Sequence, residues 1–74
     1  MTNAELLARI TSNSSIFGGK PIVRGMRIPV DLIVSLLAQG ETSESILDDY
    51  PELEPDDIRA CMIYANGSGP PRAA

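Results

Sequence analysis

The chain has 74 residues, which is enough for one small domain and no more. A chain of this length buries only about 60% of the surface that it exposes when unfolded, so a deep catalytic cleft with a lid is excluded. The hydrophobic share of 43% and the charged share of 22% are ordinary for a globular protein. We therefore expect a single domain over residues 1–67 and a disordered tail over residues 68–74.

The residue types exclude most kinds of active site. The chain has no histidine and one cysteine, Cys61, so it can form neither an internal disulfide nor a Cys/His zinc site nor a serine or cysteine triad. The adjacent aspartates at 48–49 and 56–57 diverge by about 100° on a helix and make no metal chelate. We expect a protein that is not an enzyme and that has no catalytic residue, no metal and no cofactor.

No segment predicts a membrane protein or a secreted one. No apolar run approaches the roughly 20 residues that a membrane helix requires. The N-terminus lacks the basic start and the apolar stretch of a secretory signal. The expected compartment is the cytoplasm.

Charge is divided unevenly along the chain. The first 30 residues hold four cations and one acid, whereas residues 31–58 hold nine acids and no cation. Such a division indicates two surfaces with different partners, a basic one near the N-terminus and an acidic one after it. The alternative is that both are solvated faces without a partner.

Glycine and proline divide the N-terminal half into short elements. Residues Asn3–Ile10 predict a short helix that Asn3 caps. The segments Ile22–Arg24 and Arg27–Ile28 predict two short strands, and Gly25-Met26 between them suits the centre of a type II′ turn. The triplet at 18–20, Gly-Gly-Lys, lacks the spacing of a phosphate-binding loop and indicates a turn. This half therefore predicts a small β-hairpin arm behind a helix.

The second half predicts three helices with short connections. The helix Asp31–Gln39 ends before a glycine, Ser43–Asp49 ends before a proline, and Pro55–Asn66 begins with a proline at its first position. The fold class that follows is mainly α: a three-helix, helix-turn-helix-like core with a short N-terminal helix and a small β-hairpin arm. Because the core is small and the hairpin edge is open, we expect a homodimer.

Two sequence blocks carry a family resemblance. GGKPIVRGMRIPV and then DLIVSLLAQGETSESILDDYPELEPDDIRACMIYA resemble the family known as domain of unknown function 433, and the match spans residues 6–65. The resemblance implies a helix-turn-helix, homeodomain-like fold and an antitoxin of the Vap type, which neutralises a PIN-like ribonuclease. Two residues depart from the pattern: Met26 replaces a small hydroxyl residue, and Glu54 replaces a Ser/Thr helix cap, which weakens the last helix by about 1 kcal/mol.

The acidic half predicts the surface that binds the ribonuclease toxin. A ribonuclease attracts RNA with positive charge, so an acidic protein is steered to the same surface. The alternative is that these acids only improve solubility and match helix dipoles. The predicted partner-binding residues are Glu44, Asp48, Asp49, Glu52, Asp56 and Asp57.

The basic half predicts contacts to operator DNA. Two aspartates, Asp56 and Asp57, open the last helix and repel phosphates there, so the hairpin is the better candidate for gripping DNA. The predicted DNA-binding residues are Lys20, Arg24, Arg27 and Arg59. The alternative is that these arginines pair with acids of the same chain and stabilise the fold.

Three functions therefore remain open from the sequence. The first is the antitoxin of a type II toxin–antitoxin pair that also represses its own operon. The second is a DNA-binding transcriptional regulator without a toxin partner. The third is a protein-interaction module whose helix-turn-helix is purely architectural.

Overall fold

The computed structural model describes residues 2–68 and is mainly helical, which confirms the predicted fold class. Apart from Ser68, the predicted tail at 68–74 lies outside the described residues. The elements in chain order are α1 (Asn3–Leu7), β1 (Ile10–Thr11), η1 (Phe17–Gly19), β2 (Ile22–Val23), α2 (Val30–Ala38), α3 (Ser43–Asp49), α4 (Pro55–Ile63) and η2 (Tyr64–Ser68).

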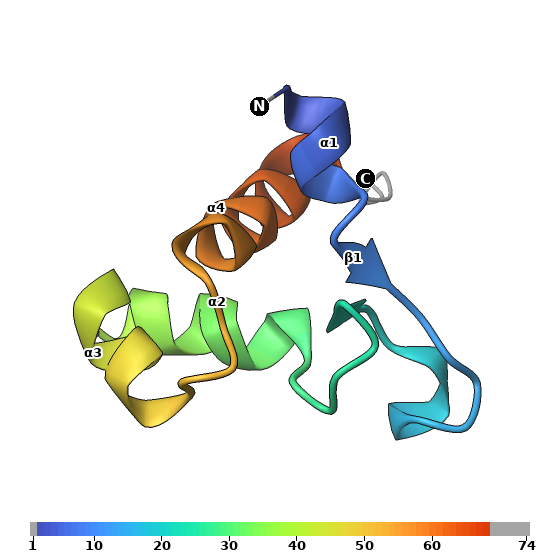
Figure 1. Cartoon of the computed structure of the whole chain (residues 1–74), viewed down its shortest axis with the longest axis horizontal. Coiled ribbons are helices and arrows are strands. Elements are labelled where there is room, and N and C mark those ends of the chain that lie inside the picture. The colour runs from blue at the N-terminus through green and yellow to red at the C-terminus, as the bar shows by residue number, and fades with distance from the viewer. Residues whose placement is uncertain (1, 69–74) are drawn as a thin grey trace.

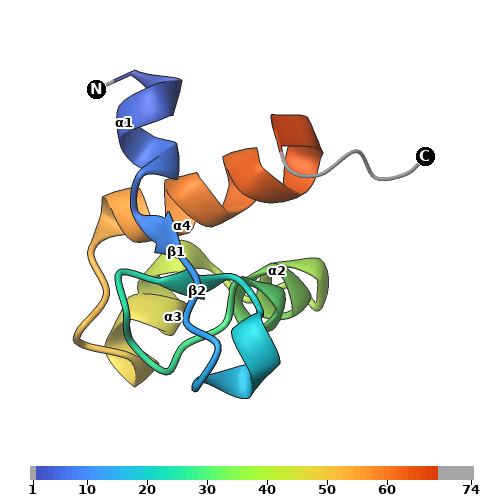
Figure 2. The ribbon, with the colours of Figure 1, turned by 90° about the vertical axis from the view of Figure 1, so that its right-hand side faces the viewer.

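The helices form two levels, with the strands beside them. Figure 1 shows α2 and α3 at the lower level and α4 rising above them towards α1. Figure 2 shows the small strand pair of β1 and β2 near the start of α4. The main buried core takes side chains from both levels and from β2: Val23, Ile28, Val30, Ile33, Ile46, Leu53, Ile58 and Cys61.

The three predicted core helices form close to their predicted bounds. Helix α3 begins and ends at the predicted residues, because the Thr42 hydroxyl accepts a hydrogen bond from the Ser45 N–H at 3.1 Å and a proline follows Tyr50. Helix α2 starts one residue early and is followed by Gly40, which has a positive φ of 98°. Helix α4 ends at Ile63, and the chain continues into the wider turn η2.

The N-terminal helix is shorter than predicted and is capped by another residue. Thr2, not Asn3, is the cap: its hydroxyl accepts from the Glu5 N–H, and the Glu5 carboxylate accepts from the Thr2 N–H. The helix ends at Leu7, because residues 10–11 leave it to pair with β2.

The predicted strand pairing is wrong in its details. The two assigned strands are β1 and β2, which run antiparallel with Ile10 opposite Val23, whereas residues 27–28 form no assigned strand. The return segment still lies beside β2, because the Val23 N–H donates to the Ile28 carbonyl at 3.1 Å and Ile22 bridges to Pro29. Strand β2 therefore has backbone neighbours on both sides.

The turn after β2 is also centred one residue earlier than predicted. The Val23 carbonyl accepts from the Met26 N–H at 2.8 Å, so Arg24 and Gly25 occupy the central positions. Both have positive φ, 45° and 73°, as in a type I′ turn. A positive φ is strained for an arginine, and the side-chain contacts of Arg24 described below hold its backbone in this conformation.

Candidate functional site

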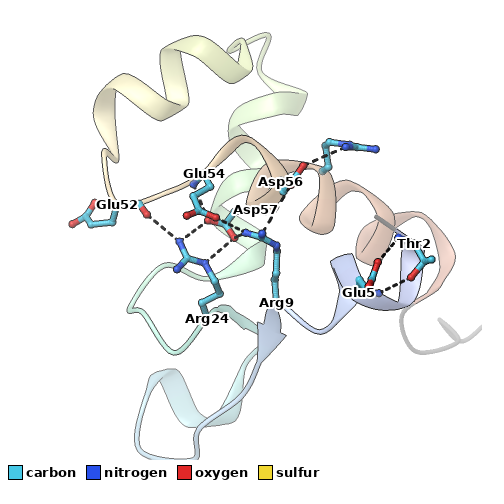
Figure 3. A network of polar contacts seen from close by, with 9 residues as sticks. Thr2, Glu5, Arg9, Arg24, Glu52, Glu54, Asp56 and Asp57 are labelled. Carbon is cyan, nitrogen blue, oxygen red and sulfur yellow. Dashed lines mark hydrogen bonds and ion pairs between the residues drawn. The ribbon is translucent and has the colours of Figure 1, made fainter.

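The side chain of Asp57 is the centre of a polar network at the start of α4. It is 0% exposed, although it carries a charge. Figure 3 shows that arginines from two distant parts of the chain converge on it. Arg24 makes a bidentate contact, with Nε donating to Oδ1 at 2.9 Å and Nη2 donating to Oδ2 at 2.8 Å. A paired geometry of this kind is among the strongest that a carboxylate can receive.

Two further donors complete the shell around this carboxylate. The Nη1 of Arg9 donates to Oδ1 at 2.9 Å and also to Oε1 of Glu54 at 2.8 Å. The backbone N–H of Glu54 donates to Oδ2 at 2.8 Å. Asp57 thus caps its own helix from the third position, a compensation for Glu54 that the sequence did not predict. The network joins the N-terminal segment, the turn after β2 and α4.

The electrostatics of the network keep Asp57 and its two arginines charged. Burial opposes ionisation of Asp57, but hydrogen bonds from Arg24, the Glu54 backbone and Arg9 outweigh burial and lower the pKa of its carboxyl below the ordinary value. Hydrogen bonds to the carboxylates raise the pKa of both arginines. A carboxylate that stays ionised among arginines is a poor acid or base near neutral pH. The network is built to hold segments together.

The lone cysteine lies in the core. Cys61 is buried, and burial, with a smaller contribution from the charge of Asp57, raises the pKa of its thiol to about 12. At neutral pH it therefore holds its proton and is a weak nucleophile. Within residues 2–68, no three acidic or cysteine side chains gather closely enough to hold a metal ion. No helix in this range has the length and apolar character needed to cross a membrane.

The four predicted DNA-binding cations have separate surroundings. Arg24 contacts Asp57 and also donates to the Glu52 carbonyl at 3.1 Å. The other two paired cations have acidic partners on α2 and α4: Lys20 lies 3.5 Å from Asp31, and Arg59 lies 3.2 Å from Asp56. Arg27 is exposed and has no ion pair among the described residues. Arg24 thus follows the predicted alternative, in which an arginine pairs with an acid of the same chain and stabilises the fold.

The predicted partner-binding acids divide into two groups. Asp57 is buried and cannot contact a partner in this conformation, and Asp56 is half-buried and lies beside Arg59 and Arg9. The remaining acids are exposed and form no ion pair within residues 2–68; they lie on α3 and in the turn after it, and are Glu44, Asp48, Asp49 and Glu52. We call these four residues the acidic face.

Arg9 and the burial of Asp57 are the features that sequence reasoning missed. One signal was present: Asp57 precedes Ala60 and Cys61 by three and four residues, the spacing that puts side chains on one face of a helix. Ala60 and Cys61 are apolar and face the core, so Asp57 lies on the same inner side of the helix. A buried aspartate then requires cationic partners, and Arg9 is one of the few available.

Comparison with known proteins gives a family and one distant relative. Residues 10–65 match the model of the family described as "Protein of unknown function (DUF433)". The "Uncharacterized protein y4eO" of Sinorhizobium fredii is 39% identical over 59 residues, which are 80% of this chain and 27% of that protein. The chain thus spans about a quarter of the length of this curated relative. No solved structure matches the chain.

Proposed function

Since this chain belongs to the DUF433 family, whose description gives no function, we propose one from the surface of the chain itself. It is a non-enzymatic antitoxin of a type II toxin–antitoxin pair. Its acidic face binds and neutralises a PIN-like ribonuclease toxin in the cytoplasm. The partner is a protein whose own binding surface is basic because its substrate is RNA.

The observation that carries the proposal is the unequal use of the two kinds of charge. Four of the five cations within residues 2–68 lie within 4.0 Å of a carboxylate of the same chain. The four residues of the acidic face have no such partner there. The charge that remains for another molecule is therefore negative, which favours a basic partner and repels nucleic acid.

Two members of the acidic face also lie where they disfavour the fold. Asp48 and Asp49 occupy the last turn of α3, where the helix dipole is negative. Lysine or arginine is preferred at such positions, and aspartate there is unfavourable by about 0.3–1 kcal/mol. A charge placed against the helix dipole, exposed and without an ion pair supports a role in binding.

The first test is association with the protein encoded by the adjacent open reading frame. We expect that neighbour to be a PIN-like ribonuclease, to copurify with this chain and to lose its RNA-cleaving activity in the complex. A neighbour that is not a nuclease, or a pair that does not associate, would contradict the antitoxin function.

A charge-matched pair of double variants then tests the acidic face. Asp48→Asn with Asp49→Asn should weaken the complex by about tenfold or more, because two charges leave the contact. The control is Glu5→Gln with Asp31→Asn, which removes the same charge from exposed sites elsewhere. Glutamine preserves the capping pattern at position 5. Equal weakening by both variants would mean that only net charge matters, and the acidic face would be rejected as the binding site.

Operator binding is the second candidate, and the observation that favours it is Arg27. This arginine is exposed and has no ion pair among the described residues, and Lys20 is only weakly engaged at the surface. A duplex of the promoter sequence should bind with a steep salt dependence that flattens in Lys20→Ala with Arg27→Ala. Arg24 is unsuitable for this test because its loss would disturb the fold. A salt slope that does not change in this variant would show that Lys20 and Arg27 do not contact the promoter.

A further inference from the structure

Helix α2 has more apolar surface than this chain covers. Seven of its nine residues are apolar, a composition typical of a helix that is buried on all sides. Only Val30 and Ile33 are fully buried. Val34 and Leu37 are only partly buried, although they are among the most hydrophobic residues of the chain. One side of α2 thus lacks a cover.

The uncovered side of α2 faces the end of α4 across an open groove. The groove has a volume of about 340 Å³ and is lined by Val34, Leu37 and Ala38 from α2 and by Met62, Ala65 and Asn66 from the end of α4 and η2. Figure 2 shows α2 below the second half of α4 on the side of the molecule opposite α1. Five of the six lining residues are apolar, and Met62 is 40% exposed.

None of the residues that line the groove carries a charge. Residues 32–40 and 60–68 contain no Asp, Glu, Lys or Arg, in a chain that has 16 of these residues. A partner selected by charge, such as the basic ribonuclease proposed above, gains nothing here. Two copies of this chain, each with a net charge of −4, repel one another through most other surfaces. On this face two copies can approach without bringing acids together.

We infer that the α2–α4 groove is the contact between two copies of this chain. The same face holds a recess and, at its edge, the exposed side chain of Met62, so a two-fold axis lets each copy place its methionine against the recess of the other. Methionine is flexible enough to fill an irregular apolar gap. The second copy also supplies the cover that α2 lacks, which a domain of this size needs for stability.

This contact replaces the one predicted from the sequence. The expected dimer used an open hairpin edge, but β2 has a neighbour on each side, with Thr11 opposite Ile22 on one side and Pro29 bridged to Ile22 on the other. The dimer through the groove does not depend on the proposed function. It leaves the acidic face on α3 to a different molecule.

A single charged residue in the groove tests the inference. Ala38 is exposed, so Ala38→Arg is compatible with the fold, and a cation in the last turn of α2 suits the helix dipole. The variant also makes the net charge of −4 less negative by one unit, so weaker association cannot result from added repulsion. The control, Ala4→Arg, makes the same change at an exposed alanine of α1.

Sedimentation equilibrium of the full chain at micromolar to millimolar concentrations measures the result. The wild type and Ala4→Arg should reach twice the monomer mass of 7.9 kDa. The dissociation constant of Ala38→Arg should rise by about tenfold or more, because an arginine would be desolvated without a partner. Circular dichroism checks that each variant is folded. A wild type that stays monomeric at millimolar concentration, or a folded Ala38→Arg that dimerises normally, would overturn the inference.

Nuclear magnetic resonance on a mixture of labelled and unlabelled chains locates the contact. We expect nuclear Overhauser effects between the Met62 methyl of one copy and the Leu37 methyls of the other. A dimer without these effects would place the contact elsewhere and reject the groove.

Discussion

Two pairs of adjacent aspartates look alike in the sequence and differ in the folded chain. Asp48 and Asp49 end α3, are exposed, and have no ion pair among residues 2–68. Asp56 and Asp57 begin α4, where the helix dipole favours negative charge, and both lie beside arginines. The charges of the first pair are unfavourable for the dipole of α3, whereas the charges of the second pair stabilise α4.

The contrast shows that position, not composition, assigns a role to an acid in this chain. The Asp57 carboxylate accepts four hydrogen bonds and cannot reach another molecule. The aspartates of α3 contribute nothing comparable to the fold and remain accessible. Variants of the two pairs should therefore change different properties: stability for the pair in α4, and binding for the pair in α3.

Asp57→Asn should have the largest effect, a loss of about 2–4 kcal/mol in the free energy of unfolding. It removes the charge that two arginines share inside the structure, and a domain of this size has only about 3–5 kcal/mol to lose. Urea denaturation measures the change. Asp56→Asn, the control in the same turn, should lose far less, because the Asp56 side chain is partly exposed and makes only surface ion pairs. Equal losses would show that burial does not distinguish the two.

Acid should weaken the same network in the wild type. The pKa of Asp57 is lower in the folded chain than in the unfolded one, so its contribution is complete above about pH 4 and disappears as the pH falls through the folded value. The effect is smaller than that of Asp57→Asn, since the protonated carboxyl stays in place and still accepts hydrogen bonds. The urea concentration at the unfolding midpoint of the wild type should decrease as the pH is lowered below 4. A constant or rising midpoint there would contradict the role of the Asp57 charge.

Arg24→Lys should reduce the free energy of unfolding by about 1–2 kcal/mol, although it keeps the charge. A lysine has a single nitrogen and cannot form the bidentate contact with Asp57. It also cannot contact Asp57 and the Glu52 carbonyl with the geometry that arginine provides. The loss is smaller than for Asp57→Asn because the Arg24 side chain is 36% exposed and Arg9 still pairs with the carboxylate. Thermal melting compares this variant with Arg27→Lys, which should behave like the wild type.

Asp48→Asn with Asp49→Asn should have the smallest effect on stability and the opposite sign. Removing charges that oppose the α3 dipole should stabilise the fold by about 0.3–1 kcal/mol. The same variant should bind the proposed ribonuclease partner more weakly. A variant that is less stable than the wild type would place these aspartates among the residues that hold the fold, and the contrast between the two pairs would disappear.

The helices were predictable because their signals are local. Thr42 before α3, Pro55 at the start of α4 and Gly40 after α2 act within one or two turns of the residues that they affect. The strand pairing was not predictable in the same way. The partner of β2 lies at residues 10–11, and nothing in the short apolar run there distinguishes a strand from the last turn of a helix.

The candidate site depends on which acids the fold leaves exposed. Glu44, Asp48, Asp49 and Glu52 are exposed, and their role in binding stays a prediction. The burial of Asp57 was not predicted, since local charge counting treats every aspartate as a surface residue. Its partners are distant in sequence, with Arg24 33 residues and Arg9 48 residues away. A contact over such a separation depends on the packing of α4 against the N-terminal segment.

The sequence by itself determined the family, the mainly helical fold and the bounds of α3, because hydrophobic periodicity and helix-ending residues act over short distances. Tertiary structure alone decided which charged side chains form ion pairs within the fold and which remain exposed at the surface. Pairing depends on where side chains meet in space, and a buried carboxylate draws in cations from anywhere in the chain. The difference between Asp57 and Asp49 is therefore a product of folding.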